Sequence, residues 1–130
     1  MDERRSFGFT LFEVFIVVAT VSTVTAIAVP SYVGQLRKSA RAEAQSFLAA
    51  VGAKENDYFR QRGHYAANLE SLRARPPASL SGKYTFKVAV ADRTEPGFTV
   101  SALAAGEQAK DACPELALDS RGGRFPDACW

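Results

Sequence analysis

The first part of the chain is apolar and the remainder mixes apolar with polar residues. No charged residue occurs from Val14 to Leu36. As a helix, this stretch would be about 35 Å long at 1.5 Å per residue. That length exceeds the roughly 30 Å thickness of a bilayer core. The pattern therefore predicts a helix that crosses a membrane.

Pro30 lies inside this stretch. Proline lacks the backbone N–H that would donate to the preceding helical turn, so we expect a kink or a loosened helix around Ala26 to Val29. Beyond Pro30 the pattern becomes amphipathic, and Gly63 is expected to end the helix. The apolar residues that recur at helical spacing are Leu36, Ala40, Ala44, Phe47, Leu48, Val51, Tyr58 and Phe59. The helix is therefore expected to continue out of the membrane and to pack this face on a domain.

The second half of the sequence predicts a small sheet. Residues 64–82 contain turn formers and Pro76-Pro77, which indicate a connecting loop with a short helical turn at 67–73. Alternating apolar and polar residues then predict strands, with Pro96-Gly97 in a hairpin turn at 92–97. The predicted strands are 84–90, 98–102 and 115–119. A long helix followed by antiparallel strands indicates an α+β fold.

One carboxylate, Glu13, stands next to the apolar run. A charge near the middle of a lipid-embedded helix costs roughly 2.5 to 3.5 kcal/mol, so such a group needs a partner. Cleavage after Gly8 would create one, because the ammonium of a new amino terminus at Phe9 is positive below a pKa of about 8. The pair could form within one chain or between neighbours, and it costs far less than a lone buried charge.

The segment Gly8-Phe9-Thr10-Leu11-Phe12-Glu13, preceded by Arg4 and Arg5, resembles the amino terminus of type IV prepilins. The resemblance implies that a prepilin peptidase cuts between Gly8 and Phe9, that Phe9 is N-methylated, and that Phe9 and Glu13 act in subunit assembly. A secretory signal would place its cleavage site after the apolar region. A plain membrane anchor explains the apolar run but not Glu13.

Features of the remaining chain resemble PilE-like minor pilins. They are Tyr58-Phe59 with Gly63 and Tyr65, Leu69 and Leu72, the strand 84–90, Lys110-Asp111 with Cys113, residues 116–122, and the terminal Cys129-Trp130. This resemblance implies the pilin fold, in which a long amino-terminal helix packs on a small antiparallel sheet with a carboxyl-terminal disulfide loop. The expected parts are a leader (1–8), a transmembrane or filament-core helix (9–36) and a periplasmic head (37–130). A proline at the position of Pro30 also resembles type IVa pilins, whose helix melts locally in the filament.

Charge placement gives two conflicting indications of orientation. Arg4 and Arg5 should stay cytoplasmic by the positive-inside rule, but Arg37, Lys38 and Arg41 follow the other end of the run. The resemblance favours a cytoplasmic leader and a periplasmic head. In that oxidising space Cys113 and Cys129 are expected to form a disulfide, worth about 3 kcal/mol, although two free thiols are the alternative.

Nothing in the sequence favours an enzyme. The single histidine, His64, lies in a Gly-His-Tyr turn, and no residue set has the spacing of a catalytic group, a cofactor loop or a metal cluster. We therefore expect no catalytic, cofactor-binding or metal-binding residues. The net charge of +2 indicates no particular partner.

The function most favoured is a minor pilin, a structural subunit of a type IV pilus that serves adhesion, twitching motility or DNA uptake. Its implied partners are prepilin peptidase, the major pilin and other minor pilins, the inner-membrane assembly platform, and membrane lipid before assembly. It would lie in the inner membrane first and in the surface pilus afterwards. Two alternatives remain: a pseudopilin of a type II secretion system, and a DNA-receptor pilin that uses Lys83, Lys110, Arg121 and Arg124.

Overall fold

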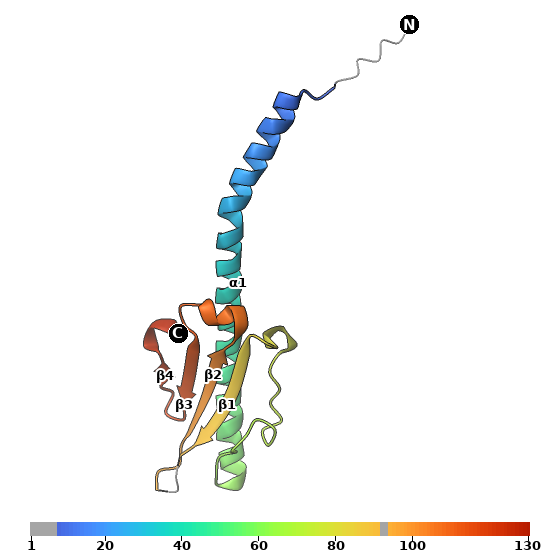
Figure 1. Ribbon diagram of the computed structural model, residues 1–130. Helices are drawn as coiled ribbons and strands as arrows, with labels where there is room; N and C mark the ends of the chain where they lie inside the picture. The colour runs from blue at the N-terminus through green and yellow to red at the C-terminus, as the bar shows by residue number, and fades with distance from the viewer. Residues whose placement is uncertain (1–7, 92–93) are drawn as a thin grey trace. The chain divides into compact units, whose positions relative to one another are not determined.

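The computed structural model describes residues 8–91 and 94–130. Its main elements are one long helix and a four-stranded antiparallel sheet (Figure 1). The chain divides into two compact units: one ends at Gln35 and the other is Leu36–Trp130. Helix α1 (Leu11–Arg62) contributes to both units.

Helix α1 has defined signals at both ends. The hydroxyl oxygen of Thr10 accepts a hydrogen bond from the backbone N–H of Glu13 (3.2 Å), which is the N-cap interaction of a Thr-x-x-Glu capping box. At the other end Gly63 adopts φ 75°, and its N–H donates to the carbonyl of Phe59 (2.7 Å). Glycine adopts this left-handed conformation readily, so the predicted end of the helix is confirmed.

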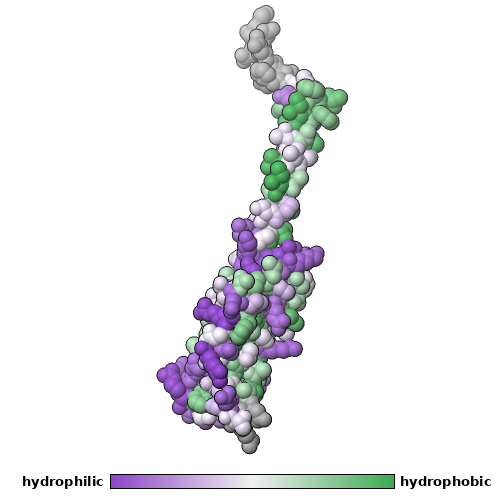
Figure 2. Space-filling view, turned by 90° about the vertical axis from the view of Figure 1, so that its left-hand side faces the viewer, coloured by the Kyte–Doolittle hydropathy of each residue, from purple (hydrophilic) through white to green (hydrophobic). Residues whose placement is uncertain are grey.

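The helix of the first unit carries apolar side chains on all sides, and none of its apolar window is buried. Figure 2 shows these residues as a narrow, mainly green and white column. The hydroxyls of Thr20, Ser22, Thr23 and Thr25 donate to carbonyls four residues earlier, at 2.7 to 2.8 Å. These four hydroxyls are thereby satisfied within the helix, which lowers the cost of placing them in lipid. It is continuous through Pro30, and the kink or local melting remains a prediction.

The second unit contains the sheet, in the order β1-β2-β3-β4. Its strands are β1 (Tyr84–Val90), β2 (Phe98–Ala104), β3 (Glu115–Asp119) and β4 (Arg124–Phe125). The first three confirm the predicted strands, and β2 extends two residues further than expected, to Ala104. Part of the predicted hairpin turn, residues 92–93, lies outside the described residues. Strand β4 was not predicted, since two residues after Gly122-Gly123 carry no alternation.

Three short 3-10 helices complete the second unit: η1 (Ala78–Leu80), η2 (Gly106–Lys110) and η3 (Asp127–Cys129). At the predicted short helical turn, 67–73, the structure has a hydrogen-bonded turn over residues 69–73 that does not continue as a helix. The side chain of Asn68 accepts from the N–H of Ser71 (2.8 Å), and Arg73 has φ 52°. A bond of this kind is typical of the first turn of a helix, but the positive φ of Arg73 prevents the turn from continuing as a helix.

The core lies between one face of α1 and the inner face of the sheet. The helix contributes Ala40, Ala44, Leu48 and Val51, which confirms the central part of the predicted stripe, although Leu36 at its start is 47% exposed. Gly52 allows close packing, since a Cβ there would lie 3.1 Å from Cδ2 of Leu118. The sheet and the loops add Ala66, Leu72, Leu80, Tyr84, Phe98, Val100, Ala102, Leu116 and Leu118.

Candidate functional site

The amino-terminal end of α1 contains the residues predicted to act in assembly. Phe9 is 80% exposed, and Gly8 and Glu13 are exposed as well. The carboxylate of Glu13 forms no ion pair with any residue in 8–91 or 94–130. Arg4 and Arg5 of the predicted leader lie outside the described residues.

The position of Glu13 has a local explanation as well as a functional one. A carboxylate in the first turn is favoured by the helix dipole, and the capping box places Glu at this position. Phe9 precedes the first residue of α1, Leu11, and is four positions from Glu13 in sequence. A positive group at Phe9 is therefore close to this carboxylate along the chain, and it could pair with it or with the same carboxylate in a second copy.

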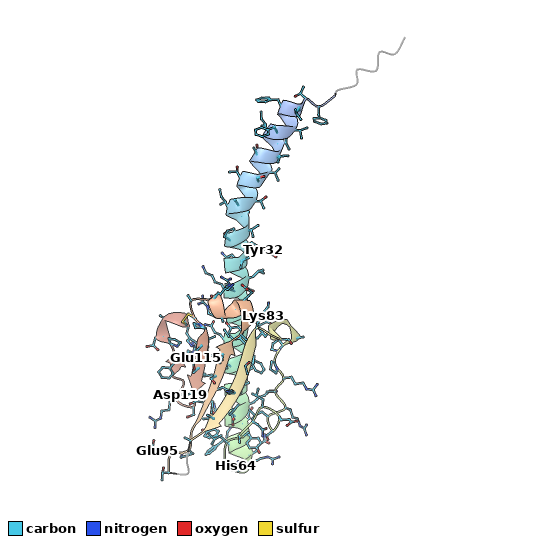
Figure 3. The ribbon with its side chains drawn as sticks, viewed as in Figure 1. Tyr32, His64, Lys83, Glu95, Glu115 and Asp119 are labelled. Carbon is cyan, nitrogen blue, oxygen red and sulfur yellow. A yellow bond between two sulfur atoms is a disulfide. The ribbon has the colours of Figure 1, made fainter. Side chains whose placement is uncertain are left out.

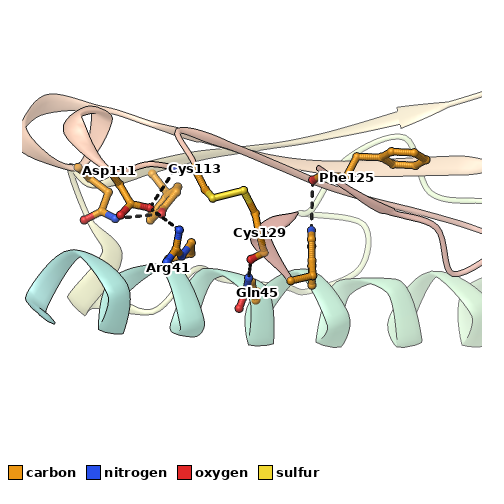
Figure 4. The surroundings of a disulfide bond; sticks show 9 residues. Arg41, Gln45, Asp111, Cys113, Phe125 and Cys129 are labelled. Carbon is orange, nitrogen blue, oxygen red and sulfur yellow. Dashed lines mark hydrogen bonds and ion pairs between the residues drawn. A yellow bond between two sulfur atoms is a disulfide. The ribbon is translucent and has the colours of Figure 1, made fainter. Parts of the chain in front are cut away.

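A disulfide closes the carboxyl-terminal loop, and two polar contacts attach this part of the chain to α1 (Figure 4). Cys113 and Cys129 are bonded, with their Cα atoms 6.0 Å apart. The side-chain amide of Gln45 donates to the carbonyl oxygen of Cys129, and Arg41 pairs with Asp111 at 3.2 Å. Sequence reasoning found the disulfide but missed both helix contacts. Their only signal was the four-residue spacing of Arg41 and Gln45 on the helix.

Glu55 is a buried carboxylic acid that sequence reasoning also missed. It is fully buried on α1, and its Oε2 accepts from the N–H of Ala66 at 2.9 Å. Among the described residues, nothing hydrogen-bonds its Oε1. Burial raises the pKa of this carboxyl, and the bond from Ala66 offsets part of that rise. The sequence signal was its position, four residues after Val51 on the apolar stripe.

A polar network joins η2 to α1 and β1. The side-chain amide of the buried Gln108 donates to the carbonyl of Arg37 (2.9 Å) and to the hydroxyl of Tyr84 (3.1 Å). Glu107 pairs with Lys110 (3.0 Å) and Arg37 (3.5 Å), and the Lys110 ammonium in particular lowers the pKa of Glu107. Gln108 therefore fixes η2 against the turn of α1 that contains Arg37.

The four basic residues suggested for DNA binding do not form one surface. Lys83 precedes β1, and its carbonyl accepts from Ala105 beside η2. Arg121 lies in the turn after β3 and pairs with Glu95 at 3.2 Å. Figure 3 labels Lys83 and Glu95 at opposite ends of the sheet. The fourth residue, Arg124, lies over the ring of Trp130, 5.2 Å from its centroid.

His64 has a structural environment. It is exposed, its ring lies 5.5 Å from that of Tyr58, and its Nδ1 is 3.2 Å from the carbonyl oxygen of Tyr65. The described residues contain no group of three His, Cys, Asp or Glu side chains that could hold a metal ion. The geometry at His64 provides no nucleophile or acid–base pair.

The long apolar helix, the helix-on-sheet packing and the carboxyl-terminal disulfide define a recognisable class. Residues 30–117 match the sequence model of the family described as "Type IV minor pilin ComP, DNA uptake sequence receptor". A solved type IV pilin from Shewanella oneidensis is similar in structure, with a TM-score of 0.59 and 26% identity. That match covers 72% of this chain and 97% of the other. The chain therefore belongs to the type IV pilins, and the family whose model it matches among them is that of ComP.

Curated relatives agree with this class. The type IV major pilin protein PilE1 of Neisseria gonorrhoeae is 36% identical over 86 residues, which are 64% of this chain and 51% of the relative. The type IV major pilin protein PilA of Myxococcus xanthus is 29% identical over 87 residues, covering 67% and 39%. The fimbrial protein EcpC of Eikenella corrodens is 31% identical over 83 residues, covering 64% and 53%. The chain spans about half the length of the curated relatives it matches.

These similarities confirm the α+β pilin fold with its carboxyl-terminal disulfide. Because the relatives are structural pilins, they point to a protein that is not an enzyme. The family and the apolar helix also fit membrane anchoring and display in a pilus, and the family implies association with other pilins.

Proposed function

We propose that this protein is a minor pilin of a type IV pilus, processed by prepilin peptidase between Gly8 and Phe9 and methylated at Phe9. The observation that carries the proposal is the match to a minor pilin family together with an exposed apolar helix whose first turn contains a carboxylate. Before assembly the helix anchors the chain in the inner membrane, with the second unit in the periplasm. The assembly platform then transfers the subunit to the pilus.

Assembly follows from the surface of α1. Its large exposed side chains, among them Phe12, Phe15 and Ile16, are stable in lipid but not in water. In a filament, the same side chains would be buried against the helices of the major pilin and other minor pilins. The Phe9 ammonium and Glu13 would then pair between neighbours and set the axial register, because an unpaired buried carboxylate is costly.

The proposal predicts that Glu13→Ala impairs incorporation more than folding. We expect the variant in the membrane at the normal level and depleted about tenfold or more in sheared filaments, as loss of a buried charge partner implies. Quantitative mass spectrometry of both fractions measures this. Glu115→Ala is the matched control, since Glu115 is an exposed carboxylate on β3. Normal amounts of Glu13→Ala in filaments would refute the role of the pair.

A DNA-receptor pilin is the second candidate, and the description of the matching family favours it. Binding through phosphates would fall steeply with rising salt. Titration of the purified chain with duplex DNA at low and moderate salt tests this candidate. Lys83 lies beside η2 and Lys110 is its last residue, whereas Arg121 lies in the turn after β3 and pairs with Glu95. These basic residues therefore do not form a single surface for a short duplex.

The third candidate, a pseudopilin of a type II secretion system, shares the same processing. The disulfide loop at the carboxyl terminus favours the pilus, as it did in the sequence. Deletion of the protein distinguishes the two, since a pseudopilin is required for secretion of enzymes and a pilin for pilus-dependent processes.

A further inference from the structure

Basic residues gather at the end of the second unit that follows the apolar helix. Arg37 and Lys38 come directly after Leu36, the last residue of the uncharged run. Lys83 and Lys110 come from other parts of the chain, before β1 and at the end of η2. We call Arg37, Lys38, Lys83 and Lys110 the basic rim.

Specific contacts hold the basic rim together. Gln108 of η2 donates to the carbonyl of Arg37 (2.9 Å), and Glu107 bridges Arg37 and Lys110. The carbonyl of Lys83 accepts from the N–H of Ala105 (2.8 Å), immediately before η2. Residues far apart in sequence are thereby fixed beside one turn of α1.

Positive charge exceeds negative charge at this rim. Its nearby acidic residues are already engaged: Glu107 is shared by Arg37 and Lys110, and Asp111 binds Arg41 at 3.2 Å. Lys38 and Lys83 are exposed and form no ion pair within the described part of the chain. These ammonium groups can bind an external anion without breaking an existing ion pair.

The location of the rim favours one kind of anion. Helix α1 is continuous from Leu11 to Arg62, so Arg37 follows the uncharged run after a single helical rise of about 1.5 Å. If that run spans the bilayer core, Arg37 and the groups fixed beside it lie at the depth of the lipid headgroups. Basic residues in this layer are attracted by anionic lipids.

We propose that the basic rim binds the phosphate groups of anionic phospholipids and holds the second unit on the periplasmic face of the membrane before assembly. This inference rests on the proposed membrane anchoring. It explains cations that the positive-inside rule would place on the cytoplasmic side. Extraction into a filament would then require these lipid contacts to be exchanged for contacts with other subunits.

The test uses the full chain in nanodiscs of phosphatidylcholine alone or mixed with phosphatidylglycerol. Mass spectrometry measures the acetylation rate of each lysine by an amine-reactive reagent. We expect phosphatidylglycerol to lower the acetylation rates of Lys38, Lys83 and Lys110 by about threefold. High salt should restore these rates, because it screens the attraction between the lysines and the lipid. Lys87 on β1 and Lys54 on α1 are internal controls, since both are exposed and outside the rim.

Variants identify the groups responsible. In the double variant Lys83→Glu with Lys110→Glu, protection of Lys38 by phosphatidylglycerol should disappear, whereas Lys87→Glu should leave it unchanged. A chain that fails to enter nanodiscs would refute membrane anchoring itself. A chain that enters them but shows equal rates in both lipids would overturn the proposed lipid binding. Protection of the rim by duplex DNA but not by phosphatidylglycerol would also overturn it and assign the surface to nucleic acid.

Discussion

Glu55 shows how a single residue on α1 departs from the apolar pattern around it. Its Oε2 is bonded by Ala66, and its Oε1 has no partner among the described residues, so the ionised form is poorly compensated. Burial raises its pKa above the ordinary carboxyl value, whereas the unfolded chain keeps the ordinary value. Within the pH range between these two values, the folded protein binds more protons, and its stability falls as the pH rises.

We expect Glu55→Gln to flatten this pH dependence, because the substituted residue does not titrate. The amide oxygen can still accept from Ala66, while the charge is removed. Urea unfolding of the full chain in detergent, followed from pH 4 to pH 8, measures the difference. Glu115→Gln should leave the profile unchanged because Glu115 is exposed. Parallel profiles for the native chain and Glu55→Gln would contradict this account.

At the scale of elements, the disulfide joins the loop before β3 to η3, at the end of the chain. It closes a sequence separation of 16 residues. We expect replacement of both cysteines, Cys113→Ser with Cys129→Ser, to lower the free energy of unfolding by about 3 kcal/mol. Reduction of the native chain should cause a similar loss and should not affect the variant. A loss well below 1 kcal/mol would show that the contacts of Gln45 and Arg41 already hold the loop.

Elements with a strong periodic signal were predictable from sequence. The helical stripe identified Ala40, Ala44, Leu48 and Val51, and alternation identified β1, β2 and β3. Gly63 marked the end of α1 because its conformation is a local property. Such elements are predictable because local sequence patterns specify them.

The missed features depend on distant contacts. Strand β4 exists because Phe125 pairs with Ala117, and two residues are too few to show alternation. The side chain of Gln108 donates a hydrogen bond to the carbonyl of Arg37, 71 positions away in sequence. The side chain of Gln45 donates to the carbonyl of Cys129, 84 positions away. The residues predicted to act in assembly, Phe9 and Glu13, differ again, since they were identified by resemblance to prepilins, and the function of the pair stays a prediction.

At the scale of the whole molecule, the two units differ in what they expose. The first is an apolar helix in which the hydroxyls of Thr20, Ser22, Thr23 and Thr25 bond to backbone carbonyls of the helix, which suits lipid or a bundle of similar helices. The second has its own core and a polar exterior. Under the proposed function, the apolar part would exchange lipid for filament neighbours, and the other part would remain in water.

The most direct test is mass spectrometry of the protein recovered from sheared surface filaments. The proposed function predicts an amino-terminal peptide that begins at Phe9 and carries an added methyl group. Its amount relative to the other pilins would then distinguish a minor from a major subunit. Recovery of only the uncut chain, retaining Met1 to Gly8 and confined to the inner membrane, would contradict the proposal and leave an ordinary membrane-anchored protein.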